Sequence, residues 1–443
     1  MRHSRWVALI ATIVLATAGT SAVAVAQGSG GDKPTASDVG ITAKEIRIAV
    51  IADVETSLAP GLFQGSVDAV NGWAKYVNKN GGIGGRKVAV DFIDSKLNAD
   101  ETRNAFITAC ENDFAVVGAS ALFVNNVDDI EACVDGAGAA TGLPDLAVVT
   151  TEVVQQCSPT TFAINPPQII CDTADQSPQT YQANAGRYYF YKKNFGKDLH
   201  GAYVYSADIK AATNANKATM GGMIELGIKA DSENTVSSRA PQSALTPIIQ
   251  SMKDASSNYF QSGASFTTTV SARKEAKLQG LTDPKIIWDC TLQCYDKRLL
   301  EQGGADVEGQ YVSLLFLPFE DAKSNPMLAN FLKFTGPAKA DGFGIQAWAS
   351  GLLFQQAAEA AVKKGGVNGL TRKALFTELN AVKDFDGDGI IGTTNIGERT
   401  TSPCYVLMQV KSSKFVRVWP KKAGTFDCKA RNRVELELDL TGG

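Results

Sequence analysis

Residues 45–149 alternate between two hydrophobic periods, and no other feature of the sequence restricts the fold as strongly. In some stretches every second residue is apolar, as in a half-buried strand; in others apolar residues recur three and four positions apart, as in a helix that buries one face. The expected strands are 46–53, 87–93, 114–117 and 146–149, and the expected helices are 64–79, one capped by Asn98 and one carrying Val127, Ile130 and Cys133. A repeated strand–helix order predicts a parallel sheet wrapped by helices.

The second half of the chain repeats this order less clearly after residue 180. We expect helices at 188–195, 211–228 and 267–279, and strands at 202–205, 258–261 and 285–289. Residues 155–172, between the halves, are proline-rich and show neither period, as a crossover between two lobes would. A chain of 443 residues is long enough for two lobes.

The first 26 residues have the pattern of an export signal. Arg2 and Arg5 form a basic start, residues 6–16 an apolar run, and Ala-Val-Ala at 24–26 a small-residue cleavage site. The mature chain is therefore expected to be exported, to the periplasm, the cell surface or the extracellular space. No cysteine near the cut offers a lipid anchor, and an uncleaved anchor at residues 6–26 stays an alternative.

All eight cysteines follow this segment, and an even number in an oxidising compartment predicts disulfides. Many pairings are open. We expect sequential ones, because each pair then falls within one local stretch: Cys110 with Cys133, Cys157 with Cys171, Cys290 with Cys294, and Cys404 with Cys428. A zinc site is disfavoured because Cys290 and Cys294 have no adjacent histidine and no second close cysteine pair.

Charge and histidine content disfavour several other functions. The net charge is −3, or −5 once Arg2 and Arg5 are removed, with no long basic run to neutralise phosphates, so nucleic-acid binding is not expected. Beyond the export segment His200 is the only histidine, which leaves no multi-histidine metal site, and no G-x-S-x-G motif supplies a hydrolase nucleophile. We expect His200 to be a surface residue. A carboxylate-based enzyme stays open, although no acidic pair stands out.

The glycine-rich stretch NGGIGGRKVAVDF, residues 80–92, resembles a phosphate-binding loop but has its neighbours in the wrong order. Such a loop follows a strand and opens a helix, whereas this one follows a helix and precedes a strand. Gly81 and Gly82 instead suit the positive-φ positions that end a helix. Arg86 and Lys87 are then placed where cations stabilise a helix C-terminus.

Residues 384–395, DFDGDGIIGTTN, partly match a calcium-binding loop. Asp384, Asp386, Asp388 and Gly389 occupy the first, third, fifth and sixth positions, but Asn395 stands where a bidentate glutamate is required. Calcium binding stays open, and we expect an acidic turn instead. No cofactor is expected.

Short polar residues lie at the expected strand ends of the first lobe, where ligands bind in open α/β sheets. They are Asp53, Ser120, Thr150 and Thr151. Ser120 and Thr150 have an equally weighted alternative, in which each caps the next helix.

Four stretches occur in the order and spacing of a known family: GITAKEIRIAVIADV, NKNGGIGGRKVAVDFIDS, ACENDFAVVGASA and GLPDLAVVTTE. The chain resembles the type I periplasmic binding proteins, and in particular the leucine/isoleucine/valine-type substrate-binding proteins of ABC importers. The resemblance implies an α/β fold of two Rossmann-like lobes with parallel central sheets, joined by a three-strand hinge. The implied division is a signal at 1–26, a linker at 27–42, a first lobe at 43–167 with a return segment at 313–397, and a second lobe at 168–312 with a C-terminal segment at 398–443.

The resemblance also implies a function and a site. The chain would be a non-enzymatic, monomeric solute receptor that holds a small polar ligand, such as a branched-chain amino acid or a related amide or organic acid, and presents it to a membrane permease. The implied ligand contacts are Ser120, Ala121, Thr150 and Thr151, with Asp53, and Asp208 and Asp289 from the second lobe. Leu122, Phe123 and Val124 depart from the small polar pattern of the family. A receptor that signals to a kinase and an enzyme working in the cleft without histidine are the alternatives.

Overall fold

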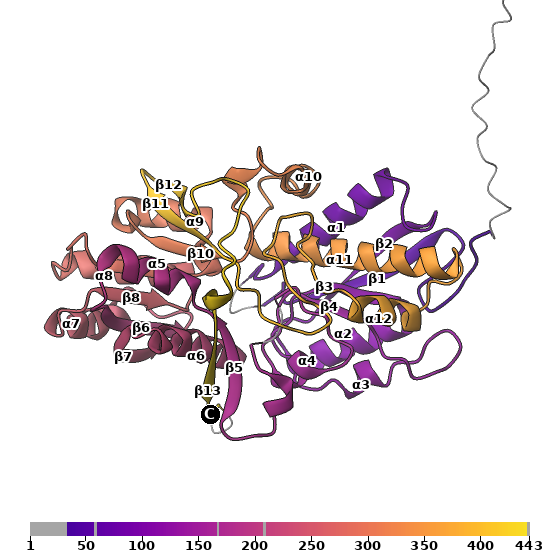
Figure 1. Cartoon of the computed structure of the whole chain (residues 1–443), viewed down its shortest axis with the longest axis horizontal. Helices are drawn as coiled ribbons and strands as arrows, with labels where there is room; N and C mark the ends of the chain where they lie inside the picture. The colour runs from indigo at the N-terminus through magenta and orange to yellow at the C-terminus, as the bar shows by residue number, and fades with distance from the viewer. Residues whose placement is uncertain (1–32, 57–59, 166–167, 207–209, 441–443) are drawn as a thin grey trace, which may run out of the picture.

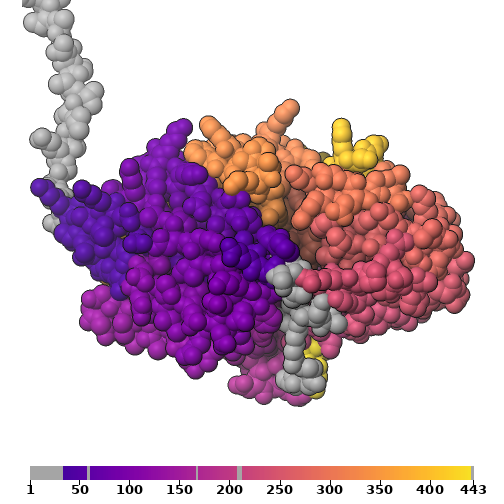
Figure 2. Space-filling view, turned by 180° about the vertical axis from the view of Figure 1, so that it is seen from behind, coloured from indigo at the N-terminus to yellow at the C-terminus, as the bar shows by residue number. Residues whose placement is uncertain are grey.

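The computed structural model describes residues 33–56, 60–165, 168–206 and 210–440. The expected export segment lies outside these ranges. The described chain forms two halves, each built around a sheet, which lie side by side in Figure 1 and meet along a boundary that Figure 2 shows from behind.

The first sheet has four parallel strands in the order β2-β1-β3-β4. Their bounds are Glu45–Ala52 for β1, Lys87–Asp94 for β2, Ala115–Ala119 for β3 and Asp145–Ala147 for β4. β1 pairs with β2 along its whole length, from Glu45 opposite Lys87 to Ala52 opposite Asp94. All four strands expected in this half are confirmed.

Helices cover both faces of this sheet. On one face lie α1 (Gln64–Lys79) and α11 (Gly342–Gly365), and on the other α2 (Ala99–Asn112). Trp73 of α1 is fully buried, and a Cβ on Gly351 of α11 would lie 2.4 Å from its ring, so the two helices pack closely there. The remaining helices of this half are α3 (Asp128–Glu131), α4 (Val153–Cys157), α10 (Pro326–Thr335) and α12 (Arg372–Asn380).

Helix ends in the first half follow from local sequence, with one correction. Asn98 caps α2 by accepting the backbone N–H groups of Asp100 and Glu101, as expected. Gly81 and Gly82 have φ of 104° and 75°, which confirms the glycine termination of α1.

Arg86 was expected beside the last carbonyls of α1, and this prediction is wrong. Its side chain is fully buried and donates instead to the carbonyl oxygens of Thr42 at 2.8 Å, Val367 at 2.7 Å and Thr35 at 2.8 Å. A guanidinium carries five donors in a planar fork, so one side chain can join segments that are far apart in the sequence.

The second sheet has seven strands in the order β12-β11-β10-β9-β8-β6-β7. Their bounds are His200–Ser206 for β6, Lys229–Val236 for β7, Tyr259–Ser262 for β8, Ile287–Cys290 for β9, Tyr311–Leu314 for β10, Val406–Lys411 for β11 and Lys414–Trp419 for β12. The strands from β7 to β10 run parallel, whereas β11 and β12 add an antiparallel edge.

Helices α5 (Gly186–Phe195) and α6 (Lys210–Glu225) pack on one face of the second sheet, and α7 (Thr246–Asp254) and α8 (Phe266–Leu278) on the other. A short helix, α9 (Lys297–Gly303), follows β9. The strands and helices expected in this half are present. The sequence did not predict the other elements, which are α7, α9, β7, β10, β11 and β12.

The two halves are joined by segments that are distant in the sequence. Strand β5 (Gln179–Asn184) pairs antiparallel with β13 (Arg433–Leu438), and both lie between the halves in Figure 1. Phe316 forms a bridge with Ile391 near the point where the chain leaves the second sheet. No helix of the described residues is long and apolar enough to cross a membrane.

The four expected disulfides are all confirmed: Cys110–Cys133, Cys157–Cys171, Cys290–Cys294 and Cys404–Cys428. No cysteine of the described chain is free.

Candidate functional site

Asp53 follows β1 directly and holds the loops at the end of the first sheet together. Its carboxylate accepts the hydroxyl of Ser95 at 2.6 Å and the backbone N–H groups of Leu97 at 2.7 Å and Leu122 at 2.9 Å. The side chain is fully buried. Because both oxygens already have donors, Asp53 positions these loops rather than offering a free carboxylate.

Ser120 lies one residue beyond β3, and its hydroxyl is occupied. Its Oγ lies 2.8 Å from Oγ of Ser66 in α1 and donates to the carbonyl oxygen of Gly118 at 3.2 Å. Ser120 and its neighbour Ala121 are both buried. The hydroxyl pair therefore joins the end of β3 to the beginning of α1.

Thr150 and Thr151 follow β4 and are half-buried. Thr151 donates from Oγ1 to the carbonyl oxygen of Leu122 at 3.0 Å. The hydroxyl of Thr150 has no hydrogen-bond partner among the described residues. The hydroxyls of Ser120 and Thr151 have partners, whereas that of Thr150 is half-buried and has no hydrogen bond within the described chain.

The alternative that Ser120 and Thr150 cap the following helices is wrong. The N-cap residue of α3 is Val127 and that of α4 is Glu152, and neither helix has a side-chain cap. The structure brings Asp53, Ser120 and Thr151 together around the backbone of Leu122, whose N–H and carbonyl bond to Asp53 and Thr151.

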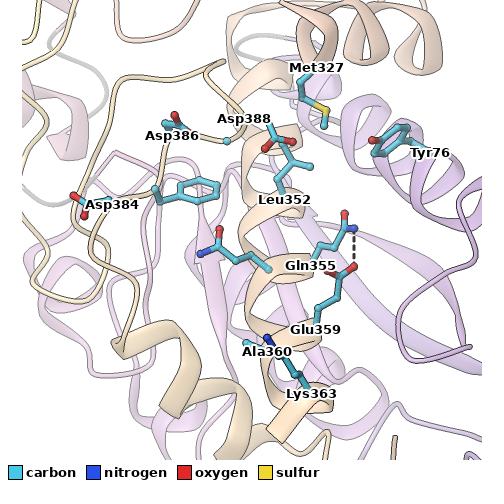
Figure 3. Close-up of a pocket in the computed structure, with 13 residues that line it drawn as sticks. Tyr76, Met327, Leu352, Gln355, Glu359, Ala360, Lys363, Asp384, Asp386 and Asp388 are labelled. Atoms are coloured by element: carbon cyan, nitrogen blue, oxygen red, sulfur yellow. Dashed lines mark hydrogen bonds between the residues drawn. The ribbon is translucent and has the colours of Figure 1, made fainter. Parts of the chain in front are cut away.

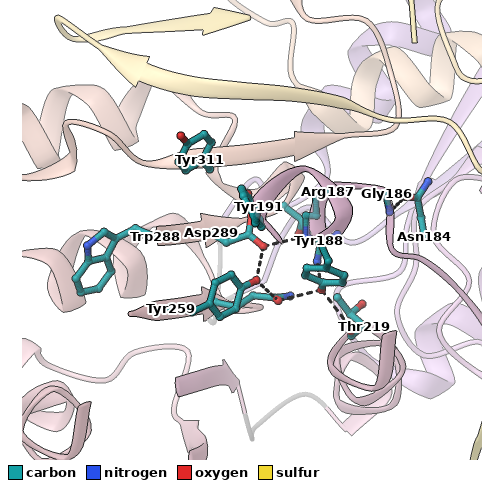
Figure 4. A network of polar contacts seen from close by, with 12 residues as sticks. Asn184, Gly186, Arg187, Tyr188, Tyr191, Thr219, Tyr259, Trp288, Asp289 and Tyr311 are labelled. Atoms are coloured by element: carbon teal, nitrogen blue, oxygen red, sulfur yellow. Dashed lines mark hydrogen bonds and ion pairs between the residues drawn. The ribbon is translucent and has the colours of Figure 1, made fainter. Parts of the chain in front are cut away.

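Asp289, from the second half, lies in a buried polar network that Figure 4 shows. The carboxylate forms an ion pair with Arg187 of α5, with 2.9 Å between Nε and Oδ2. It also accepts the hydroxyls of Tyr191 at 2.8 Å and Tyr259 at 2.7 Å. All four side chains are buried, so this carboxylate is neutralised internally.

Charge balance keeps Arg187 protonated in this environment. Burial alone lowers its pKa, but Tyr188 and Asp289 raise the pKa of Arg187 above its usual value. Burial, followed by the charge of Asp289, raises the pKa of Tyr259 well above that of a free tyrosine, so the phenol stays a donor.

Two polar groups at the end of β8 have no partners in the described chain. Nε2 of Gln261 and Oγ of Ser262 are both buried and have no hydrogen bond to a described residue. Oε1 of Gln261 lies 3.0 Å from the hydroxyl oxygen of Tyr188 and 2.8 Å from that of Tyr259. Asp208, the other residue expected here, lies outside the described residues.

His200 lies on the surface, as expected, and bonds to Asp231, with 2.7 Å between Nδ1 and Oδ2. Ser257 donates its hydroxyl to the same carboxylate at 2.5 Å. In a hydrolase triad the serine bonds to the histidine, whereas here both bond to the acid. This arrangement does not activate the serine.

Sequence reasoning missed the partners of Asp289. Arg187 is the second residue of the stretch GRYYFYKKNF, and four aromatic residues follow it at 188–191. That density of tyrosine beside an arginine is the signal that was available, since buried tyrosines need hydrogen-bond partners.

The three aspartates of the acidic turn at residues 384–395 are exposed, and their carboxylates lie apart. Figure 3 shows them as Asp384, Asp386 and Asp388. Phe385 and Thr394 bridge the base of the turn. Within the described ranges no group of three histidine, cysteine, aspartate or glutamate side chains is arranged to hold a metal ion.

Comparison with solved structures identifies the fold. The chain is similar to a fatty acid ABC transporter substrate-binding protein from Thermomonospora curvata, with 16% identity, 91% of this chain and 96% of that chain covered, and a TM-score of 0.67. It is also similar to a leucine binding protein from Thermotoga maritima, with 16% identity, 84% and 97% covered, and a TM-score of 0.60.

A substrate-binding protein of an ABC transporter from Aeropyrum pernix matches with 15% identity, 88% and 97% covered, and a TM-score of 0.66. None of the curated proteins matches the sequence. The model of the family described as periplasmic binding protein matches residues 45–414, which include the first sheet and the strands of the second sheet up to β11. The chain therefore belongs to the periplasmic binding protein family, which is non-enzymatic.

Proposed function

We propose that this chain is the exported substrate-binding protein of an ABC importer, which encloses one small polar ligand between its two halves and presents it to a membrane permease. The ligand class proposed is an amino acid of the branched-chain type, or a related amide or organic acid. The observation that carries the proposal is the family match across residues 45–414. The structural similarity to substrate-binding proteins of ABC transporters supports it.

Residues of the strand-end loops of both sheets belong to one buried hydrophobic cluster. Leu122 and Val148, after β3 and β4, belong to the same buried cluster as Phe266 and Cys294, after β8 and β9. In addition, Leu292 lies where it would be 3.6 Å from a Cβ on Gly342, at the start of α11. A ligand held between these loops would contact both halves and would favour a closed arrangement.

We assign different roles to the expected site residues. The hydroxyl of Thr150 donates to the ligand from the first half, that of Thr151, which donates to Leu122, accepts from the ligand, and Asp208 from the second half completes the site. Asp53, Ser120 and Ala121 hold the loops beneath, and Asp289 stabilises the second half through Arg187. The proposed hinge lies at the expected lobe boundaries, near residues 167, 313 and 397, of which residue 313 falls within β10 of the second sheet.

A thermal-shift screen of amino acids, small amides and short organic acids tests the proposal. A ligand present at about 100 times its Kd stabilises the folded protein by about 2.7 kcal/mol. Calorimetry on each hit should give one site per chain. If no member of these classes shifts the melting temperature, the proposed ligand class is wrong. Permease and ATPase genes beside this one would support an importer, and a kinase gene alone would support a sensor.

A further inference from the structure

The disulfide between Cys110 and Cys133 has a buried cation against one of its sulfur atoms. Arg372, the first residue of α12, is fully buried, and its Nη1 donates to Sγ of Cys133 at 2.9 Å. Within the described ranges, no charged side chain donates to a sulfur of the other three disulfides. This contact therefore sets the Cys110–Cys133 disulfide apart.

The guanidinium of Arg372 is fixed in position around this disulfide. A guanidinium has five N–H groups in a planar fork, and here all five have acceptors. One is the sulfur of Cys133, and the other four are backbone carbonyl oxygens, those of Val134 at 2.6 Å, Cys110 at 2.9 Å, Asp113 at 2.6 Å and Phe114 at 3.2 Å. The cation is thus held against the sulfur by the backbone on both sides of the disulfide.

The positive charge of Arg372 is incompletely balanced. Its side chain forms no ion pair with a described residue, because its acceptors are carbonyls and a sulfur. Burial lowers the pKa of Arg372, and the charges of Asp38, Asp135 and Asp113 offset this only in part. Burial also raises the pKa of Asp113 to about 7, so that this carboxyl is partly protonated near neutral pH. A thiolate at Cys133 would supply an anion in contact with the guanidinium, which favours the thiolate form.

The two sulfur atoms differ in access. Cys133 is 3% exposed, whereas Cys110, near the end of α2, is half-buried. In thiol–disulfide exchange a thiolate attacks one sulfur and the other leaves, and the exchange is faster when the leaving thiol has a lower pKa. Exposure and charge therefore both favour attack on Cys110, with Cys133 as the leaving group.

We propose that Cys110 is a site of reversible S-thiolation by small thiols, and that Arg372 determines which of the two sulfurs leaves. The thiolate of the small molecule forms a bond to Sγ of Cys110, the bond to Cys133 breaks, and its electron pair stays on Sγ of Cys133 beside Arg372. The Cys133 thiolate reverses the exchange by attacking Cys110 and expelling the small thiolate. The exchange needs no further oxidant or reductant, because one disulfide replaces another.

This site is separate from the residues proposed to bind the transported ligand. Phe114 directly precedes β3, so the disulfide lies at the amino end of that strand, whereas Ser120 follows its carboxyl end. The inference consequently does not rest on the proposed transport function.

Exchange on the native wild-type protein tests the proposal directly. The folded protein is treated briefly with 2-mercaptoethanol, quenched with acid, alkylated with N-ethylmaleimide and mapped by peptide mass spectrometry. Peptides from this disulfide should carry mercaptoethanol on Cys110 and the alkyl group on Cys133. Mercaptoethanol found mainly on Cys133, or equally on both cysteines, would overturn the assignment.

A second measurement isolates the effect of Arg372 on the thiol. The variant Cys110→Ser leaves Cys133 as the only free thiol among the described residues, since the other six cysteines stay paired. Titration followed by the ultraviolet absorbance of the thiolate should give Cys133 a pKa below about 7.5, compared with about 8.5 for a free cysteine.

The matched control is Cys133→Ser, which frees Cys110 instead and should give a thiol pKa near or above 8.5, about the ordinary value. In the Cys110→Ser protein, Arg372→Gln should raise the pKa of Cys133 by about one unit or more, and Arg372→Lys, which keeps a cation, should restore part of the shift. A purely structural role of Arg372 predicts no such rescue. The proposal is wrong if the thiol of Cys133 titrates no lower than that of Cys110.

Discussion

Arg187 and Asp289 form an ion pair whose two side chains are 5% and 0% exposed, with 2.9 Å between Nε and Oδ2. The pair joins α5 to the middle of the second sheet. Removing one member of a buried pair leaves an uncompensated charge, which costs about 3–5 kcal/mol, whereas replacing both by apolar residues is often neutral.

Arg187→Met should therefore destabilise the protein by about 3–5 kcal/mol, and Arg187→Met/Asp289→Leu should recover part of that loss. Urea unfolding of the two variants and the wild type measures both values. Lys277→Met is the matched control, because it breaks a pair with Asp306 in which the lysine is 66% exposed. A double variant no more stable than Arg187→Met would contradict the role given to the pair.

Asp145, in β4, should make stability depend on pH. Burial raises its pKa to about 6, although Gln155 and Thr161 donate to it. A folded pKa above the unfolded one means that the folded state holds the proton more tightly, so this contribution is complete below about pH 4 and is lost as pH rises through 6.

Asp145→Asn should remove this dependence and stabilise the protein at pH 7.5 by up to about 3 kcal/mol, since each pKa unit corresponds to about 1.4 kcal/mol. The new amide can also donate to the oxygen of Gln155, which has no partner in the described chain. The measurement is urea unfolding at pH 4.5 and 7.5. Asp113 and Asp341 also have raised pKa values, so the difference between variant and wild type is compared. An equal difference at both pH values would refute the assignment.

The four disulfides should be reduced in an order set by exposure. A reducing thiolate must reach a sulfur atom, so buried disulfides react slowly. Cys428 is exposed, whereas Cys290 and Cys294 are both fully buried. Partial reduction, alkylation and peptide mapping should find Cys404–Cys428 opened first and Cys290–Cys294 last. The reverse order would show that the loop around Cys290 opens in solution.

Thr150→Ala should weaken ligand binding without weakening the fold. A hydroxyl removed beside a bound polar group costs about 1–3 kcal/mol, or roughly 5- to 150-fold in Kd. Ser120→Ala should do the opposite, since it removes a buried hydroxyl that bonds to Ser66. Calorimetry with the identified ligand and thermal unfolding separate the two effects. Wild-type affinity in Thr150→Ala would mean that the ligand binds elsewhere.

The spacing of apolar residues predicted the helices and strands that bury one face. Helix α1 was expected at 64–79 and spans Gln64–Lys79, because its apolar positions recur regularly. Strand β7 was missed for the opposite reason: its sequence KADSENTV is polar and, as an edge strand, it is mostly exposed. The helix around Ile130 is shorter than expected, since only Asp128–Glu131 is helical.

The candidate site was predictable only as a set of positions. The strand-end rule located Asp53, Ser120 and Thr150, but whether each hydroxyl or carboxylate is occupied depends on partners from other segments. Asp53 bonds to Leu122, 69 residues away, and Asp289 to Arg187, 102 residues away. The spacing of apolar residues along the sequence carries no information on contacts between residues so far apart.

The position of β13 near the end of the sequence affects how the chain folds while it is being synthesised. Helix α11, which covers Trp73, begins at Gly342, and β13, which pairs with β5, ends at Leu438. When the ribosome has synthesised only the residues before α11, neither α11, which covers the first sheet, nor β13, the partner of β5, is present. The nascent polypeptide keeps apolar surface exposed until synthesis is almost complete, a state that chaperones bind.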